Sequence, residues 1–72
     1  KRTAAVTVGD ACHIGALCVI AKGVTVGDHC LVGAGSVLTE SAPAYSIVRG
    51  NPARVIGRVH LEEDLRLEFF NP

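Results

Sequence analysis

The feature that most constrains this chain is a five-residue segment, VTVGD, that occurs at residues 6–10 and again at residues 24–28. The interval of eighteen residues contains a shorter period of six. Aliphatic residues occupy every sixth position from residue 8 to residue 38: Val8, Ile14, Ile20, Val26, Val32 and Leu38. A fixed short period is typical of solenoid proteins, in which each repeat stacks on the next.

The residues around each aliphatic position predict how one repeat folds. Two positions earlier stands a small or modest residue: Val6, Cys12, Cys18, Val24, Cys30 and Ser36. Residues two apart on a strand point to the same side, so each repeat sends one small and one larger side chain inward. Glycine follows four of the six aliphatic residues and lets the backbone turn. Three such units make one triangular coil, and we expect the two VTVGD copies at the same corner of neighbouring coils.

The residues between the inward positions should point outward, on three faces of the coil. These outward pairs are Thr7 with Thr25, His13 with Leu31, and Val19 with Val37. An apolar pair such as Val19 and Val37 favours a covered surface over one left in water. We therefore expect neighbouring subunits to cover this face around a threefold axis.

The pattern resembles the hexapeptide-repeat family, whose members fold as a left-handed parallel β-helix. Handedness comes from the family, because the usual crossover rule would give a right-handed coil. The resemblance continues through VGAGSVLTESAPAYSIVRGNPARVIG, residues 32–57. This segment is similar to the closing coil and extended arm of acetyl-CoA-dependent acyltransferases, the group containing galactoside, maltose and nucleotide-sugar acetyltransferases. The expected fold class is therefore all-β, a left-handed parallel β-helix.

Three parts of the chain are expected. Residues 1–42 form the hexapeptide-repeat coils, residues 43–60 form an extended arm with the GNPARVIG motif, and residues 61–72 form a short C-terminal helix or tail. Within the arm, Gly50-Asn51-Pro52 is a turn signal.

The prediction of a terminal helix depends on the segment HLEEDLRLEFFNP. Leu61 and Leu65 stand at helical spacing, and acidic residues lie where the first turn of a helix favours negative charge. Phe69 and Phe70 are expected to pack this helix against the rest of the chain. The sequence therefore predicts a short capping helix.

Composition limits the partners and the compartment. Seven basic and seven acidic residues cancel, which gives no reason to expect nucleic acid or an anionic membrane as a partner. No apolar run approaches the ~20 residues that a membrane span requires, and no signal-peptide pattern is present. The odd number of cysteines fits neither a disulfide framework nor a metal knuckle. We expect a soluble, cytoplasmic protein in which Cys12, Cys18 and Cys30 are reduced and fill inward positions.

The resemblance implies a transferase that moves an acetyl group from acetyl-CoA, its co-substrate, to a hydroxyl or amine of a sugar or nucleotide-sugar. Family members are trimers, so a homotrimer is expected. This chain would be the C-terminal, CoA-binding part. The alternative is a non-catalytic hexapeptide scaffold or assembly domain, and further coils with a His or Asn facing the groove would favour the enzyme.

The same resemblance implies the residues that bind CoA. Ala16 and Ala34 lie on neighbouring coils where backbone groups contact the pantetheine arm. Thr39 matches the threonine of the closing coil, Arg54 matches a basic residue near the nucleotide end, and Arg58 stands close to a second. Together these five residues are the expected cofactor-binding set.

Two positions depart from the family pattern. Glu40 replaces a lysine that contacts phosphate in relatives. The catalytic base of the similar acetyltransferases is a histidine upstream of the segment equivalent to VTVGD, where this chain reads KRTAA. His13 falls where many relatives have tryptophan and does not take that role. The base is therefore expected upstream of Lys1, or is not used.

A metal site is not expected. One branch of the same fold holds zinc with histidines, and this chain has His13, His29 and His60. Their spacings put no two of them on equivalent positions of adjacent coils, so the close pair that a zinc site needs is absent.

Overall fold

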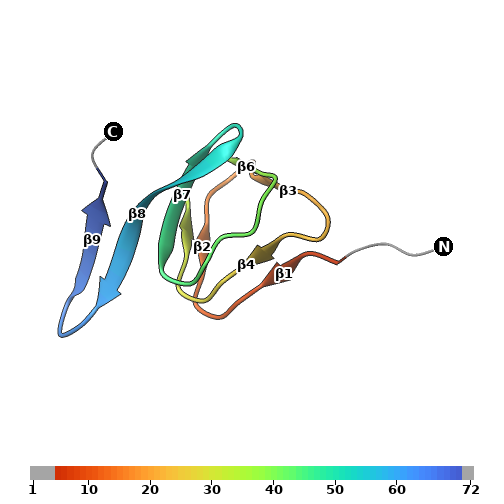
Figure 1. Cartoon of the computed structure of the whole chain (residues 1–72). Helices are drawn as coiled ribbons and strands as arrows, with labels where there is room; N and C mark the ends of the chain where they lie inside the picture. The colour runs from red at the N-terminus through yellow and green to blue at the C-terminus, as the bar shows by residue number, and fades with distance from the viewer. Residues whose placement is uncertain (1–4, 71–72) are drawn as a thin grey trace.

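The computed structural model describes residues 5–70, which form strands and turns (Figure 1). The first six strands are two residues long and follow the hexapeptide period, whereas the last three are longer. The strands are β1 (Thr7–Val8), β2 (His13–Ile14), β3 (Val19–Ile20), β4 (Thr25–Val26), β5 (Leu31–Val32), β6 (Val37–Leu38), β7 (Ser46–Gly50), β8 (Ala53–Leu61) and β9 (Leu65–Phe69).

The two VTVGD copies lie side by side, as the period predicts. Strands β1 and β4 pair in parallel with Thr7 opposite Thr25, and the pairs β2–β5 and β3–β6 keep the same offset of eighteen residues. The three pairs form the three sides of a triangular coil (Figure 1). The predicted parallel β-helix and its three outward faces are thereby confirmed.

The core lies inside the second coil. Its inward residues are buried: Val24, Val26, Cys30, Val32, Ser36 and Leu38. The corresponding residues of the first coil are only partly covered, and Val6, Val8 and Ile14 are exposed. A solenoid coil gains most of its burial from its neighbours, and within residues 5–70 the first coil has a neighbour on one side only.

The third coil is shortened. Val26 bridges Ala42, sixteen residues further on, and β7 pairs in parallel with β5 so that Leu31 lies opposite Ile47. The offset falls from eighteen to sixteen because the step from Leu38 to Ala42 takes four residues where the earlier coils take six. On the face formed by β2 and β5, the parallel stacking therefore continues as far as the end of β7.

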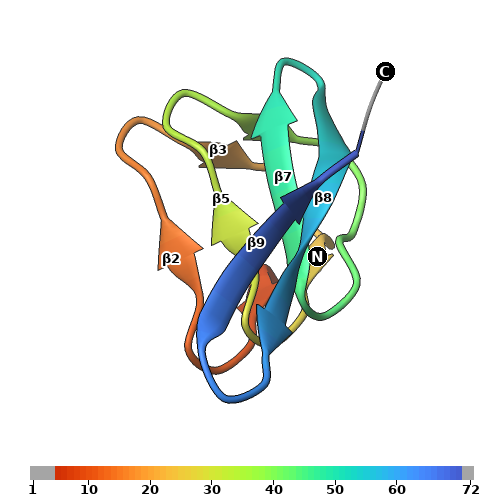
Figure 2. The same ribbon diagram turned by 90° about the vertical axis from the view of Figure 1, so that its left-hand side faces the viewer.

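Beyond the coils the chain turns back twice to extend one sheet. The predicted turn at Gly50-Asn51-Pro52 joins β7 to β8, and these strands are antiparallel with a register shift between Ile47 and Val48. Strand β9 then pairs antiparallel with β8. The sheet order is β2-β5-β7-β8-β9; Figure 1 shows the β8–β9 hairpin standing away from the coil, and Figure 2 views the molecule from the side of this hairpin.

The predicted helix in residues 61–72 is wrong over the described residues. Leu65, Leu67 and Phe69 alternate with charged residues, which is the period of a strand and not of a helix. Strand β8 offers an unpaired edge, and pairing with it satisfies the backbone of β9 in a way that a helix of two turns would not. Across residues 5–70 we find no helix with the length and apolar composition needed to cross a bilayer.

The residues expected to anchor that helix also behave differently. Phe69 is 59% exposed and Phe70 is 46% exposed, so neither is packed into the core. The acidic residues 62–64 form the short loop between β8 and β9. Their charge therefore lies at a hairpin tip, and there is no helix dipole for it to stabilise.

Candidate functional site

Ala16 and Ala34 lie one above the other at the corner that follows β2 and β5. The Gly35 amide donates a hydrogen bond of 2.9 Å to the Ala16 carbonyl. A Cβ built on Gly15 would lie 2.6 Å from the Ala34 nitrogen, so the close stacking at this corner requires glycine at position 15. Both alanines are exposed. The structure therefore brings the first two predicted site residues together on an open ledge of backbone.

The turn between β7 and β8 lies on the same corner, one coil further on. The Gly33 amide donates to the Val48 carbonyl at 2.9 Å, and the Gly50 amide donates to Ser36 Oγ at 3.3 Å. The stem of Arg49 packs over Gly33, where a Cβ would lie 2.9 Å from Arg49 Cγ. These contacts hold the β7–β8 turn firmly against the coil.

Arg54 stands directly opposite Arg49 in the β7–β8 ladder. Directly opposed residues of an antiparallel pair project to the same face, where two like charges repel each other. Both side chains are exposed, and neither makes an ion pair with any other residue in the part of the chain that the structure describes. Within residues 5–70, Arg54 Nη1 donates only to the Ala53 carbonyl, at 3.1 Å. Two unneutralised guanidinium groups on one face form a local anion-binding surface.

Thr39 lies at the other end of β6 from Ala34. It follows Leu38, whose carbonyl accepts a hydrogen bond of 2.9 Å from the Ala21 amide of the coil below. Thr39 is exposed. The β3–β6 face therefore runs from the corner of Ala34 to the corner of Thr39, with the apolar outward residue Val37 between them.

Arg58 is separated from the other predicted residues. It lies opposite Ser46, at the far end of β7 from the Arg49–Arg54 pair. Four residues along a strand correspond to about 13 Å. Arg58 lines a hollow of about 300 Å³ together with Tyr45, Phe70 and neighbouring residues. The five predicted residues thus divide into a group of four around the β3–β6 face and one outlier.

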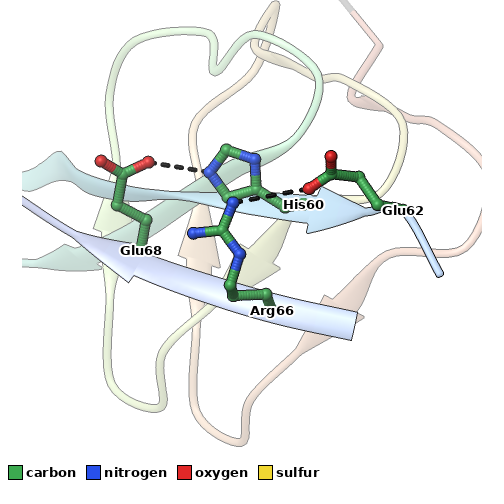
Figure 3. Close-up of polar contacts among 4 residues, drawn as sticks. All are labelled: His60, Glu62, Arg66 and Glu68. Atoms are coloured by element: carbon green, nitrogen blue, oxygen red, sulfur yellow. Dashed lines mark hydrogen bonds and ion pairs between the residues drawn. The ribbon is translucent and has the colours of Figure 1, made fainter. Parts of the chain in front are cut away.

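The histidines lie elsewhere on the molecule. His13 is on β2, and the ring of His29 stacks on Tyr45 with centroids 5.0 Å apart. His60 Nε2 lies 2.8 Å from Glu68 Oε1 across the β8–β9 hairpin, and this hydrogen bond lowers the pKa of Glu68 (Figure 3). Within residues 5–70, no three His, Cys, Asp or Glu side chains gather as a metal site would require. The expected base upstream of Lys1 lies outside the described residues.

The cysteines occupy inward positions and also make directed contacts. Cys12, Cys18 and Cys30 are all free thiols. Each Sγ lies close to a carbonyl oxygen of the next coil: 3.1 Å from Gly27, 3.1 Å from Gly33 and 3.0 Å from Pro43. Burial raises the pKa of the Cys30 thiol. A protonated thiol that donates to a backbone carbonyl suits a structural role better than a nucleophilic one.

Sequence reasoning missed Arg49. Its position follows from the shortened coil, because residue 49 stands sixteen residues after Gly33 just as Val48 stands sixteen after Val32. The eighteen-residue period would have paired Gly33 with residue 51. The signal that could have found Arg49 is the aliphatic pair Ile47-Val48, which repeats the outward-inward pair Leu31-Val32.

The known proteins that this chain is similar to are acetyltransferases. A 2,3,4,5-tetrahydropyridine-2,6-dicarboxylate N-acetyltransferase from Halalkalibacterium halodurans is 51% identical, with 85% of this chain and 29% of the relative aligned. A maltose O-acetyltransferase structure from Clostridium difficile 630 superimposes with a TM-score of 0.78 at 40% identity, covering 81% of this chain and 31% of that one. A galactoside acetyltransferase in complex with coenzyme A superimposes with a TM-score of 0.72 at 42% identity, covering 74% and 26%.

The chain spans less than a third of the length of these relatives. The family profile described as bacterial transferase hexapeptide (six repeats) matches residues 5–40, which is half of the chain and includes both VTVGD copies. With this match and the similarity of its coils to those structures, the chain belongs to the bacterial transferase hexapeptide family and has that family's left-handed parallel β-helix fold.

Proposed function

We propose that this chain is the coenzyme-binding part of an acetyl-CoA-dependent acyltransferase. The observation that carries the proposal is the Arg49–Arg54 pair, which lies above the stacked corner of Ala16 and Ala34. No residue in the described part of the chain forms an ion pair with either arginine. CoA has a phosphate-rich nucleotide end and a long, mostly neutral pantetheine arm. A guanidinium pair beside an open ledge of backbone suits both parts of such a molecule.

The β3–β6 face gives the pantetheine arm a path. It begins at the Ala34 corner, passes the outward Val37, and ends at Thr39. An apolar strand surface with exposed backbone at its corners can hold an extended chain through van der Waals contact and a few hydrogen bonds. In this proposal the thioester lies toward Thr39, and the phosphates lie at Arg49 and Arg54.

The acceptor is a small molecule with a hydroxyl or amine, and a sugar or nucleotide-sugar is our specific proposal. Its support is the similarity to maltose and galactoside acetyltransferases, while the similarity to an N-acetyltransferase favours keeping amines in the set. Acyl transfer also needs a general base to take the acceptor's proton. We propose that residues preceding Lys1 supply it.

The same proposal includes a homotrimer in the cytoplasm. Val19 on the β3–β6 face is 56% exposed, and Leu17 at the adjoining corner is 90% exposed. A second subunit packed on this face would cover both and would close the groove in which CoA lies. The free thiols of all three cysteines fit a reducing compartment.

The decisive experiment measures donor kinetics in the full-length protein. Arg54→Ala should raise the KM for acetyl-CoA by about tenfold, because one charged hydrogen bond of ~1.5 kcal/mol is lost far from the thioester. Arg49→Ala should act in the same direction. The kcat and the KM of the acceptor should change little, since the contact is made equally in the ground state and the transition state.

Arg66→Ala is the matched control, because Arg66 is an exposed arginine on β9 that lies outside the proposed groove. Arg58→Ala decides whether the outlying arginine also contributes. Dephospho-CoA thioesters locate the contact: a mutation that matters only with the complete coenzyme places the arginine on the 3′-phosphate. If the full-length protein does not bind acetyl-CoA, or if neither Arg49→Ala nor Arg54→Ala changes its affinity, the proposal is wrong.

A further inference from the structure

Strand β9 is the last strand of the five-stranded sheet, and within the described residues it pairs with β8 alone. The β8–β9 ladder is regular, with Gly57 opposite Phe69 and Leu61 opposite Leu65 and no register shift between them. Natural sheets protect such an edge with charged side chains, a proline, a bulge or an inward-pointing charge. The two charged residues of β9, Arg66 and Glu68, are opposite in sign, so they repel a second copy only in some registers. Residues 65–69 contain no proline and no bulge, so β9 presents a straight edge.

The backbone groups that face this edge can be identified. The Phe70 amide donates to the Ile56 carbonyl at 2.8 Å, and the Val59 amide donates away from β9, to the Tyr45 carbonyl. Hydrogen bonding alternates along an antiparallel pair, so the even-numbered residues of β9 bond to β8. The amide and carbonyl groups of Leu65, Leu67 and Phe69 therefore point to the free edge.

The side chains of β9 divide by face in the same alternation. Leu65, Leu67 and Phe69 share one face and are 68%, 39% and 59% exposed. Arg66 and Glu68 share the other face, where Figure 3 shows them on the same side of the hairpin as Glu62 and His60. An edge with one apolar face and one charged face fits a partner strand that carries the same arrangement.

We propose that β9 pairs antiparallel with β9 of a second copy of this chain, across a twofold axis at Leu67. In this register Leu67 faces Leu67 of the other copy, Leu65 faces Phe69, and Arg66 faces Glu68. The facing residues Leu67 and Leu67, and Leu65 and Phe69, all have backbone groups that point to the free edge. In each facing pair the two amides can therefore donate to the two carbonyls of the opposite strand. The charged pairs fall on the positions without backbone hydrogen bonds, where side chains approach most closely.

The sequence LRLEF selects this register over its neighbours. Moving the axis by one residue toward the N-terminus sets Arg66 against Arg66, and moving it one residue the other way sets Glu68 against Glu68. Like charges directly opposed are destabilising. If the axis passed between two residues, for example between Arg66 and Leu67, apolar side chains would face charged ones. Among the residues of β9, opposite charges meet only when the axis passes through Leu67.

The existing contacts of the charged side chains leave room for this partner. Arg66 Nη2 lies 3.5 Å from Glu62 Oε1, and the side chains of Arg66 and Glu68 remain 60% and 51% exposed. A guanidinium carries five donors, and an ionised carboxylate accepts several hydrogen bonds. On the other face, Phe69 of the second copy would lie beside Leu65 and remove both side chains from water.

The test is a charge exchange in the full-length protein, measured by sedimentation velocity up to about 100 µM, the concentration range of a weak specific contact. The wild-type protein should form a species of at least twice the mass of its smallest species. Arg66→Glu and Glu68→Arg should each weaken this doubling by about tenfold or more, because each variant turns both facing pairs from attraction to repulsion.

Mixing the two variants is the sharper measurement. Glu at position 66 of one variant then faces Arg at position 68 of the other, and both facing pairs become attractive again. The mixture should regain the doubled species at concentrations where neither variant forms it alone. Loss of the internal contacts with Glu62 and His60 would not be reversed by mixing, which separates the interchain pairing from a local fault in the hairpin.

Cross-linking tests the register. Leu67→Cys should form an oxidised dimer, because facing residues at the axis have Cα atoms about 5.5 Å apart, within the range of a disulfide. Leu65→Cys should not, since its two copies are separated by about four residues along the strands. The proposal is wrong if the wild-type protein never doubles its mass or if the single variants associate as the wild type does. It is also wrong if the mixture of variants does not associate, or if residues 65 and 67 cross-link equally.

Discussion

The two copies of VTVGD have the same five residues, but their inward valines have opposite environments. Val8 of the first copy is 42% exposed, whereas Val26 of the second is completely buried. Both residues point inward from equivalent strands that pair with each other. What differs is that β4 has β1 on one side and the chain at Ala42 on the other, while β1 has a described neighbour only at β4.

The comparison teaches that the burial of an inward side chain is decided by the neighbouring coils and not by the residue type. Each six-residue repeat contributes one small and one larger inward side chain, so a coil contributes three of each, and these cover the side chains of the coils on either side. The free energy that a given valine contributes therefore depends on how many coils surround it. Matched substitutions in the two copies measure this dependence directly.

The largest difference is expected between Gly27→Ala and Gly9→Ala. A Cβ on Gly27 would collide with the backbone nitrogen of Ala44 and lie 2.7 Å from its Cα. A Cβ on Gly9 would collide with the carboxylate of Asp28, which accepts a hydrogen bond from the Asp10 amide, and its nearest backbone contact, the Asp28 nitrogen at 2.9 Å, is less close. Overpacking against fixed backbone should lower the free energy of unfolding by about 3 kcal/mol at position 27 and by about 1 kcal/mol at position 9. Urea denaturation of both variants measures the difference, and equal losses would contradict it.

Next in size is the pair Val26→Ala and Val8→Ala. Removing buried methyl groups from Val26 should cost about 2 kcal/mol, while Val8 should lose less than about 1 kcal/mol in a polypeptide of residues 1–72. The same pair in the full-length protein sharpens the comparison. If another coil covers β1 there, Val8→Ala should become as costly as Val26→Ala.

The stacked thiols should show the same contrast in their reactivity. Cys30 is 1% exposed and Cys12 only partly buried, although both occupy the same position of neighbouring coils. Because burial raises the pKa of Cys30 and blocks access to it, this thiol should react with a maleimide about tenfold more slowly than Cys12 in the native chain. Mass spectrometry of partly labelled protein gives both rates. Equal rates after denaturation serve as the control.

The smallest effect is expected at the β8–β9 hairpin, which lies outside the stack. The hydrogen bond from His60 lowers the pKa of Glu68, so its stabilising contribution is present above the ordinary carboxyl pKa of 4.5 and disappears as pH falls through the lowered value. Glu68→Gln should therefore reduce the hydrogen-exchange protection of β9 amides at pH 6 and leave it unchanged near pH 3. Glu63→Gln, in the hairpin loop, is the matched control. A loss of protection that is the same at both pH values would exclude this ion pair as its cause.

The candidate site could be predicted in part. The corner of Ala16 and Ala34 follows from the eighteen-residue period, because alanines at equivalent positions of neighbouring coils must lie together. Arg54 was selected through the GNPAR motif, but its partner Arg49 was not. That pair comes from the register of the β7–β8 hairpin, and the third coil, two residues shorter than the others, brings the hairpin turn onto the same corner.

The sequence by itself determined the regular part of this protein. A six-residue alternation of small, outward and aliphatic positions predicts a triangular parallel coil, its three faces and the pairing of the VTVGD copies, whereas the left-handed sense of the coil follows from the family. The tertiary structure alone decided the rest. Whether an inward valine is buried depends on the next coil, and residues 65–69, whose alternation already fits a strand, are paired because β8 offers them an edge. Propensity and spacing describe a segment alone, whereas burial and strand pairing depend on the neighbour it meets.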